Sequence, residues 1–161
     1  KHGKTKVIKK FAKKYGLKKY SVNTSAEDNM HNNVKTALNN SNALLALPDR
    51  SVYNSNTVKN ILLTSYRYRK PVIAFSRYFV NAGALASIHS SVEQVALSAS
   101  LLIERYYELD RRFEKTINHP QLFDISINKQ VFRALDLSPP DIDQLKQKLE
   151  QKTSNKPEAA L

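Results

Sequence analysis

The chain has 161 residues, which is enough for one domain with a sizeable core, and its formal net charge is +12 at pH 7. It contains no cysteine, so disulfides, thiol catalysis and cysteine-based metal sites are excluded. No apolar run approaches the roughly 20 residues that a membrane-spanning helix needs.

The first predicted helix is strongly basic. Nine lysines precede Tyr20, and the first acidic residue is Glu27. Gly16 is expected to end this helix. An apolar stripe recurs at helical spacing, with lysines on the rest of the circumference: Val7, Ile8, Phe11, Ala12 and Tyr15. The simpler interpretation is an amphipathic helix packed on a sheet with a solvated lysine face. The alternative is an electrostatic contact with nucleic acid or an anionic membrane.

A strand is predicted next, from Lys18 to Val22. The sequence Thr24-Ser25-Ala26-Glu27 is a capping box and predicts the start of a second helix. One face of that helix is apolar: Met30, Val34, Ala37 and Leu38.

Two short apolar runs, Ala43 to Leu47 and Pro71 to Phe75, predict strands covered on both faces. A helix of suitable length for a crossover lies between them, with its buried side at Val58, Ile61, Leu62 and Ser65. We therefore expect two adjacent or near-adjacent inner strands of a parallel sheet. A polar loop follows each strand, at the carboxyl end where such sheets bind ligands.

A long helix is predicted from about Ala86 to Tyr107, and Asn118-His119-Pro120 breaks the pattern beyond it. A last strand (Phe123 to Ile127), a short helix (Lys129 to Leu135) and a final helix capped by Asp141 follow. The long helix repeats apolar residues at helical spacing: Val92, Val95, Ala96, Ala99, Leu102, Ile103 and Tyr106.

This alternation of helices and covered strands predicts an α/β fold with a mostly parallel sheet flanked by helices. We expect a single lobe over residues 1–152 and a flexible tail over residues 153–161.

Several motifs carry a family resemblance: Pro-Asp-x-x-Val-Tyr-Asn-Ser (48–55), Pro-Val-Ile-x-Phe-Ser (71–76), Gly-Ala-Leu-Ala-Ser (83–87), Ile-Asn-Lys (127–129), Ala-Leu-Asp-Leu (134–137) and Pro-Pro (139–140). In this order they resemble the ABC-transporter substrate-binding proteins of the type I periplasmic-binding fold. The branch in question includes proteins assigned as aromatic-amino-acid binders. The resemblance covers roughly residues 22–149.

The resemblance implies a Rossmann-like lobe, because this chain is similar only to the second half of a two-lobed protein. We interpret it as a processed or truncated product, or as a chain that has lost the first lobe. The implied function is capture of a small organic solute, such as an amino acid, for an ABC importer. Its implied partners are the solute, the transporter permease, and the missing first lobe or a second copy of this chain. The implied location is periplasmic or exported.

In such a fold the long helix belongs to the other lobe. The side carrying Val95, Leu102 and Tyr106 is therefore expected to lie partly uncovered within this chain. A dimer or a swapped arrangement would cover it.

The candidate ligand-binding residues lie on the two loops after the inner strands: Asp49, Arg50, Ser51, Tyr53, Asn54, Ser76, Arg77 and Tyr78. An arginine would clamp a carboxylate, Asp49 would accept from an ammonium group, and a tyrosine would supply a flat wall. The simpler interpretation of the first loop is a turn, with Ser55 or Asn56 capping the next helix. Gly83 meets a backbone requirement, either a positive φ or a close approach, and the resemblance makes it a hinge or a crossover between lobes.

Enzymatic chemistry is not expected, and neither is a cofactor, a metal or a catalytic residue. The four histidines, His2, His31, His89 and His119, show no metal-ligand spacing. No nucleophile elbow or phosphate-binding loop is present, and nothing aims Asp49, Ser76 and His89 at one another as a triad. A ligand-sensing or protein-interaction module built on one lobe is the main alternative. Nucleic-acid binding through the basic first helix is the third and least favoured.

Overall fold

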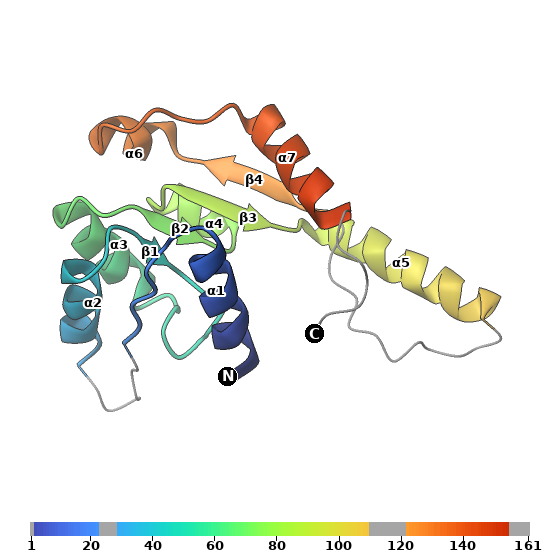
Figure 1. Ribbon diagram of the computed structural model, residues 1–161, viewed down its shortest axis with the longest axis horizontal. Helices are drawn as coiled ribbons and strands as arrows, with labels where there is room; N and C mark the ends of the chain where they lie inside the picture. The colour runs from blue at the N-terminus through green and yellow to red at the C-terminus, as the bar shows by residue number, and fades with distance from the viewer. Residues whose placement is uncertain (1, 23–28, 110–121, 155–161) are drawn as a thin grey trace. The chain divides into compact units, whose positions relative to one another are not determined.

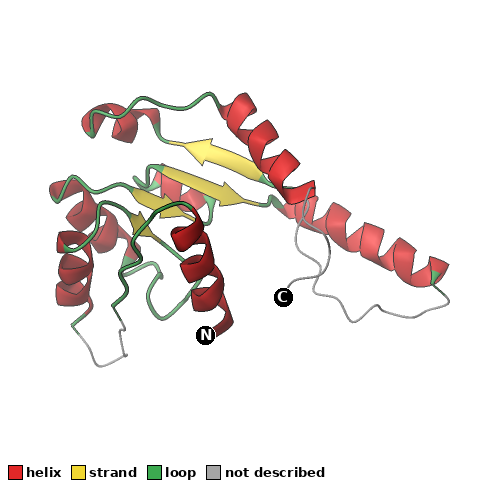
Figure 2. Ribbon diagram, in the orientation of Figure 1, coloured by secondary structure: helices red, strands yellow, loops and turns green. Residues whose placement is uncertain are grey.

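The computed structural model describes residues 2–22, 29–109 and 122–154 (Figures 1 and 2). Its elements are α1 (His2–Lys14), α2 (Met30–Asn39), β1 (Leu44–Leu45), α3 (Val58–Arg67), β2 (Val72–Ala74), α4 (Arg77–Asn81), β3 (Ala86–His89), α5 (Val92–Glu108), β4 (Asp124–Ile127), α6 (Lys129–Ala134) and α7 (Ile142–Ser154). The chain divides into two compact units. The first comprises the residues up to Leu44 and those from Pro48 to Pro71; the second comprises Leu45–Leu47 and the residues from Val72 onward.

The four strands form one sheet in the order β1-β2-β3-β4. Strands β2 and β3 are parallel, with Ile73 opposite Ala86. The N–H groups of Leu44 and Ala46 donate to the carbonyls of Pro71 and Ile73 at 2.9 and 2.8 Å. Donors and acceptors that advance together in this way are typical of parallel pairing. Strand β4 runs antiparallel to β3. The prediction of a mostly parallel α/β fold is confirmed, with β4 as the exception.

The two strands predicted to be inner differ in the structure. In β2, Val72 and Ala74 are buried, as expected. Strand β1 is adjacent to β2 but stands at the end of the strand order, and Leu45 is 52% exposed. The prediction that Ala43 to Leu47 is covered on both faces is therefore wrong. An edge strand has a neighbour on one side only, so fewer elements are available to cover it.

The first unit contains a helical core in which α2 packs against α3. The face of α3 predicted from its periodicity is buried: Val58, Ile61, Leu62 and Ser65, with Leu38 from α2. The side chain of Asn29 begins α2 by accepting from Asn32 N. The expected capping box at 24–27 lies outside the described residues. The predicted strand at Lys18 to Val22 is wrong: this stretch is irregular, and both Leu17 and Tyr20 are exposed.

Replacing Ser65 by alanine should raise the stability of the protein by about 0.5–1.5 kcal/mol. The Ser65 hydroxyl is buried and has no hydrogen-bond partner among the described residues, so it carries an uncompensated desolvation cost. Alanine is also the better helix former. The neighbouring Thr64 is a suitable control, because its hydroxyl donates to Asn60 O at 2.7 Å, and Thr64→Val should destabilise. Urea unfolding checks both variants, and a less stable Ser65→Ala protein would contradict the expectation.

The second unit builds its core around β2 and β3. Helix α4 packs on β3 and β4, and α7 packs on β4. The buried residues of this unit are Ala46, Val72, Ala74, Phe79, Val80, Ala84, Leu85, Ser87 and Phe132. The final helix begins as predicted, because Asp141 Oδ1 accepts from the N–H groups of Asp143 and Gln144. It extends to Ser154, into the stretch expected to be tail.

Four helices end on a residue in the left-handed region: Gly16 (φ 67°), Arg69 (φ 52°), Gly83 (φ 117°) and Asp136 (φ 56°). After each of these residues the next N–H reaches back into the last turn of the helix, as in the Schellman motif. The N–H of Leu17 donates to Ala12 O, and that of Ala84 donates to Phe79 O, both at 2.8 Å. The prediction that Gly16 ends the first helix is confirmed.

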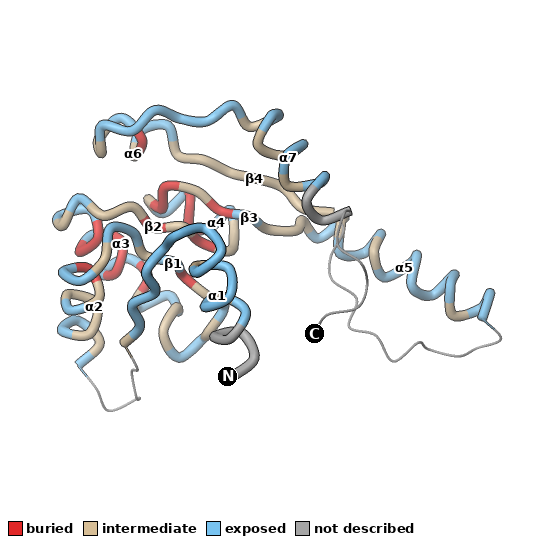
Figure 3. The backbone as a smooth tube through the Cα atoms, in the orientation of Figure 1, coloured by how far each residue is buried: buried red, intermediate tan, exposed pale blue. Residues whose placement is uncertain are grey.

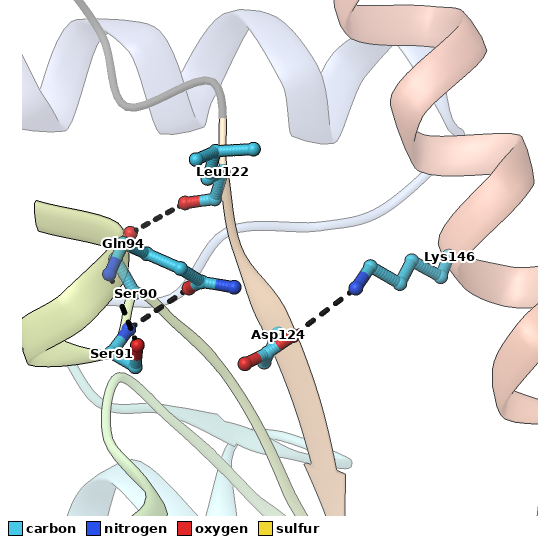
Figure 4. Close-up of polar contacts among 6 residues, drawn as sticks. All are labelled: Ser90, Ser91, Gln94, Leu122, Asp124 and Lys146. Atoms are coloured by element: carbon cyan, nitrogen blue, oxygen red, sulfur yellow. Dashed lines mark hydrogen bonds and ion pairs between the residues drawn. The ribbon is translucent and has the colours of Figure 1, made fainter. Parts of the chain in front are cut away.

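The region predicted as the start of the long helix is a strand. Residues Ala86–His89 form β3, and α5 begins only at Val92. A capping box fixes this boundary: Gln94 N donates to Ser91 Oγ, and Ser91 N donates to Gln94 Oε1 at 2.9 Å (Figure 4). In the same view Ser90 Oγ donates to Leu122 O at 2.8 Å. The start of α5 is thereby tied to the residues that lead into β4.

An exposed ion pair joins α7 to β4. Lys146 Nζ lies 3.1 Å from Asp124 Oδ1 (Figure 4). The hydrogen bond from this ammonium group holds the pKa of the Asp124 carboxyl below its usual value. Because both side chains remain partly exposed, at 37% and 44%, water screens the pair and it contributes little to stability. That contribution is present above the carboxyl's ordinary pKa and is lost as the pH falls through the lowered one.

Candidate functional site

The loop after β1, residues 48–57, is a compact hydrogen-bonded turn. Asp49 Oδ1 accepts from the Ser51 N–H at 3.0 Å and from the Ser51 hydroxyl at 2.6 Å. The Asp49 carbonyl accepts from Val52 N and Tyr53 N. Asp49 and Ser51 therefore already serve the backbone of the loop. Their polar atoms are held in fixed positions by these local bonds.

Asn54 organises the second half of the same loop. Its Oδ1 accepts from Asn56 N and Thr57 N at 3.0 and 3.2 Å, and its Nδ2 donates to Arg50 O at 3.3 Å. Thr57 occupies the N-cap position of α3, and its hydroxyl donates to Val52 O. The expectation that Ser55 or Asn56 caps this helix is wrong. Asn54 instead accepts from the N–H groups at the start of the helix: its side chain bonds Thr57 N, and its carbonyl bonds Val58 N.

Tyr53 is half-buried within this loop. Burial and, to a smaller extent, the nearby Asp49 carboxylate together raise the pKa of its phenol to about 12. The sign follows from the charge of the ionised form, which is disfavoured both by loss of water and by a neighbouring anion. Tyr53 thus stays neutral at physiological pH and remains able to donate and accept hydrogen bonds.

Arg50 has a different character from its neighbours. Its side chain is exposed, and within the described residues it makes no hydrogen bond or ion pair. The turn is held by Asp49 and Asn54 and makes no use of the guanidinium group. An arginine held on an ordered turn with its donors unused is suited to bind a carboxylate bidentately.

The second predicted loop is in fact the first turn of a helix. Arg77 and Tyr78 begin α4, and Ser76 is its N-cap residue, without a capping hydrogen bond from its side chain. Arg77 is exposed, and the described part of the chain holds no partner for its guanidinium group. Tyr78 is 65% exposed, and its ring meets Phe79 edge-on at 6.2 Å. Buried Phe79 and Val80 anchor the helix, so that these polar residues project from a fixed base.

Gly83 is placed by the structure at the end of α4. Its φ of 117° is accessible to glycine but not readily to other residues. A Cβ built at Gly83 would meet nothing within 4 Å. The predicted backbone requirement is therefore confirmed as a positive φ, not as a close approach. Its role as a hinge stays a prediction.

Metal ligation finds no support in the described residues, where no group of three or more potential ligands comes together. His89 Nδ1 lies 3.3 Å from Ser87 Oγ, but Ser87 is fully buried and cannot reach a substrate. His31 is exposed on α2. His119 lies outside the described residues.

Helix α5 is coloured as exposed or intermediate along its length in Figure 3, and its apolar residues share this exposure. None of its residues is buried. The exposed fractions of Val92, Val95 and Ile103 are 81%, 55% and 55%. The expectation of an uncovered apolar face on this helix is confirmed. A surface of this kind usually marks an interface. No helix in the described ranges is both long and apolar enough to cross a membrane.

The parallel strands joined by crossover helices define an α/β fold, a class in which ligands commonly bind beyond the carboxyl ends of the strands. The sequence profile of the ABC transporter substrate binding protein family matches residues 2–146. The chain therefore belongs to this family. Its members are typically non-enzymatic and usually act outside the cytoplasm. No curated protein matches the sequence.

The solved structures that share the fold include these three. One is a conserved domain protein from Vibrio cholerae O1 biovar El Tor, with 18% identity and a TM-score of 0.64 over 85% of this chain and 46% of that one. Another is an ABC domain in complex with L-Trp from Streptococcus pneumoniae, with 18% identity, a TM-score of 0.65, and coverage of 89% and 48%. A third is the ligand-free, open form of a substrate-binding protein with adhesive properties from Clostridium difficile, with 19% identity, a TM-score of 0.62, and coverage of 87% and 48%. This chain spans about half the length of each.

Proposed function

We propose that the protein captures a small organic solute, such as an amino acid, as a substrate-binding component of an ABC importer. The family match over residues 2–146 carries this proposal. It is supported by the structural neighbour that was solved with L-Trp. The proposed mechanism is binding without chemistry, followed by delivery to a permease.

We assign the solute contacts to residues on the two segments that follow β1 and β2. Arg50 and Arg77 would each offer a guanidinium group to a carboxylate. Tyr53, with its neutral phenol, and Tyr78 would supply aromatic surface with a polar tip. Asp49 would accept from an ammonium group through its carboxylate, which also accepts from Ser51. Ser51, Asn54 and Ser76 complete the proposed set, and Gly83 is proposed as the hinge.

Calorimetric titration tests the proposed function directly. A set of amino acids that includes L-tryptophan is titrated into the 161-residue chain and into the longer gene product, where the gene encodes one. Saturable binding of one class of amino acid is the expected result. An absence of binding in the longer protein, across amino acids and related small acids, would contradict it.

A second candidate function, a protein-interaction module, is favoured by α5. Six exposed or half-buried apolar residues of this helix and its C-cap follow a 3-4-3-4-3 spacing: Val92, Val95, Ala99, Leu102, Tyr106 and Leu109. This spacing places them along one seam, as in helices that pair with other helices. We propose that a first lobe covers this seam in a two-lobed protein, and that a second copy covers it in the isolated chain.

The isolated chain is expected to dimerise through this seam, as measured by light scattering at tens of micromolar. Leu102→Glu should shift it to monomer, because a charge in an apolar helix interface is poorly solvated. Leu97→Glu is the matched control, since Leu97 is exposed but lies off the seam. A monomeric wild-type chain would contradict this expectation, and so would equal effects of the two substitutions.

A further inference from the structure

Helix α1 has two chemically distinct sides. Its apolar residues occur together on one side, and Lys9, Lys10, Lys13 and Lys14 occupy the other. On the apolar side, Ile8 and Ala12 are half-buried. The adjoining ridge of Val7, Phe11 and Tyr15 is exposed to 38%, 39% and 51%. The stripe predicted to pack on a sheet is thus covered along one edge only, and its other edge faces outward beside the lysines.

The lysines border this ridge directly. Lys14 Nζ lies 5.8 Å from the centre of the Tyr15 ring, within the range of a cation–π contact. The irregular segment after the helix continues the same composition, since Leu17 is 66% exposed and Tyr20 48% exposed, with Lys18 and Lys19 between them. The surface formed by residues 7–20 is therefore both basic and apolar.

The charge of the N-terminal segment also points to an anionic partner. Nine lysines and no acidic residue occur before Glu27, against a net charge of +12 for the whole chain. A segment that carries this many cations and no carboxylate of its own attracts an anionic partner. A basic helix with an exposed apolar edge is the pattern of segments that lie in the plane of a membrane surface.

We propose that the surface formed by residues 7–20 binds an anionic lipid bilayer peripherally. Val7, Phe11 and Leu17 enter the boundary between headgroups and acyl chains. Tyr15 and Tyr20 lie at headgroup level, where amphipathic rings are favoured. The lysines face the lipid phosphates, each strengthening binding through the negative surface potential. This interaction is separate from solute binding, because it uses none of the residues assigned to the solute.

Nucleic acid is the competing anionic partner, and two details disfavour it. Every cation before Glu27 is lysine, and the first arginine of the chain is Arg50. Arginine, with its planar fork, is the side chain suited to bidentate phosphate and base contacts. Val7 and Leu17 also provide no flat face on which a base could stack. Both features fit a lipid surface, which needs point charges beside flexible aliphatic side chains.

Co-sedimentation of the 161-residue chain with vesicles tests the proposal. Vesicles of phosphatidylcholine alone are compared with vesicles containing one quarter phosphatidylglycerol, at low and at physiological salt. Binding is expected only to the anionic vesicles and should weaken with salt. The triple variant Lys10→Gln, Lys13→Gln, Lys14→Gln should lose on the order of a hundredfold in partitioning, at about fivefold per lysine.

A matched triple variant provides the control for net charge. Lys59, Lys129 and Lys148 are exposed and lie outside residues 7–20, and their replacement by glutamine removes the same charge. This control should retain most of the binding. Phe11→Ala and, separately, Leu17→Ala should each weaken binding several-fold at unchanged charge. Leu17 is exposed in an irregular segment, so its substitution tests the apolar contact even if Phe11→Ala disturbs the fold.

Three outcomes would overturn the proposal. The first is equal binding to neutral and anionic vesicles, or binding to neither. The second is an equal loss of binding in the two triple variants, which would show attraction by net charge alone. The third is tighter binding to a single-stranded oligonucleotide than to anionic vesicles at the same salt concentration, which would assign the surface to nucleic acid.

Discussion

Arg50→Ala and Arg77→Ala are each expected to weaken the binding of a carboxylate-bearing solute by about 1.5–3 kcal/mol, the range for hydrogen bonds to charged groups. This corresponds to roughly ten- to a hundredfold in affinity. Both guanidinium groups are exposed and make no hydrogen bond or ion pair within the described residues. Each is therefore ready to bind a ligand without first giving up an internal bond. Calorimetric titration of the solute measures the loss.

Folding should hardly change in either arginine variant, because exposed arginines contribute little to stability. Arg133→Ala is the matched control, since Arg133 is exposed on α6 and has no assigned role in the site. Its affinity for the solute should equal that of the unmodified protein. If both Arg50→Ala and Arg77→Ala bind the solute as tightly as the control does, the site lies on other segments.

Asn128→Ala is expected to destabilise the protein by about 1.5–2.5 kcal/mol, the sum of a lost helix cap and one lost hydrogen bond. The Asn128 side chain caps α6 by accepting from Gln130 N and Val131 N, both at 3.1 Å. It also donates to Val80 O at 3.0 Å, and its own N–H donates to Leu85 O. Loss of a cap costs about 1 kcal/mol. Loss of the hydrogen bond to the Val80 carbonyl, which still accepts from the N–H of Gly83, adds roughly 0.5–1.5 kcal/mol.

The substitution Asn128→Asp separates these two contributions. A carboxylate still accepts from the first turn of α6, and it suits the positive end of the helix. It cannot donate to the Val80 carbonyl, so an intermediate loss of stability is expected. Chemical unfolding of the three proteins gives the comparison. Equal stabilities for the alanine and aspartate variants would show that the cap contributes nothing measurable.

The parts of the fold that sequence patterns predicted are those determined locally. The 3.6-residue period of Val58, Ile61 and Ser65 found the buried face of α3, and the apolar run at 71–75 found β2. Strand β3 was missed because its position between β2 and β4 depends on pairing with other segments, and a local sequence pattern does not show that pairing. One signal was available: Ser91-Val92-Glu93-Gln94 is a capping box, which places the start of the helix after His89.

The candidate site was predictable in part, for a related reason. Position after a strand and residue type were enough to single out Arg50 and Arg77, both of which are exposed. The same criteria selected Asp49 and Asn54, whose side chains hold the turn together. Aspartate and asparagine serve turns and ligands through the same oxygen atoms. Sequence alone therefore does not distinguish a residue that stabilises a turn from one that binds a ligand. The hydrogen bonds seen in the structure make that distinction for this loop.

The antiparallel pairing of β3 with β4 has a consequence for how much the intervening chain can vary. The register joins His89 to Asp124, so that the whole of α5 lies inside one long loop between two paired strands. The entropy of closing such a loop grows only with the logarithm of its length, and each doubling costs about 0.6 kcal/mol. Since no residue of α5 is buried, shortening the loop would remove little that holds the sheet together. The sheet therefore places few constraints on the sequence of α5. The choice of its apolar residues is expected to depend on the molecule that packs against the helix.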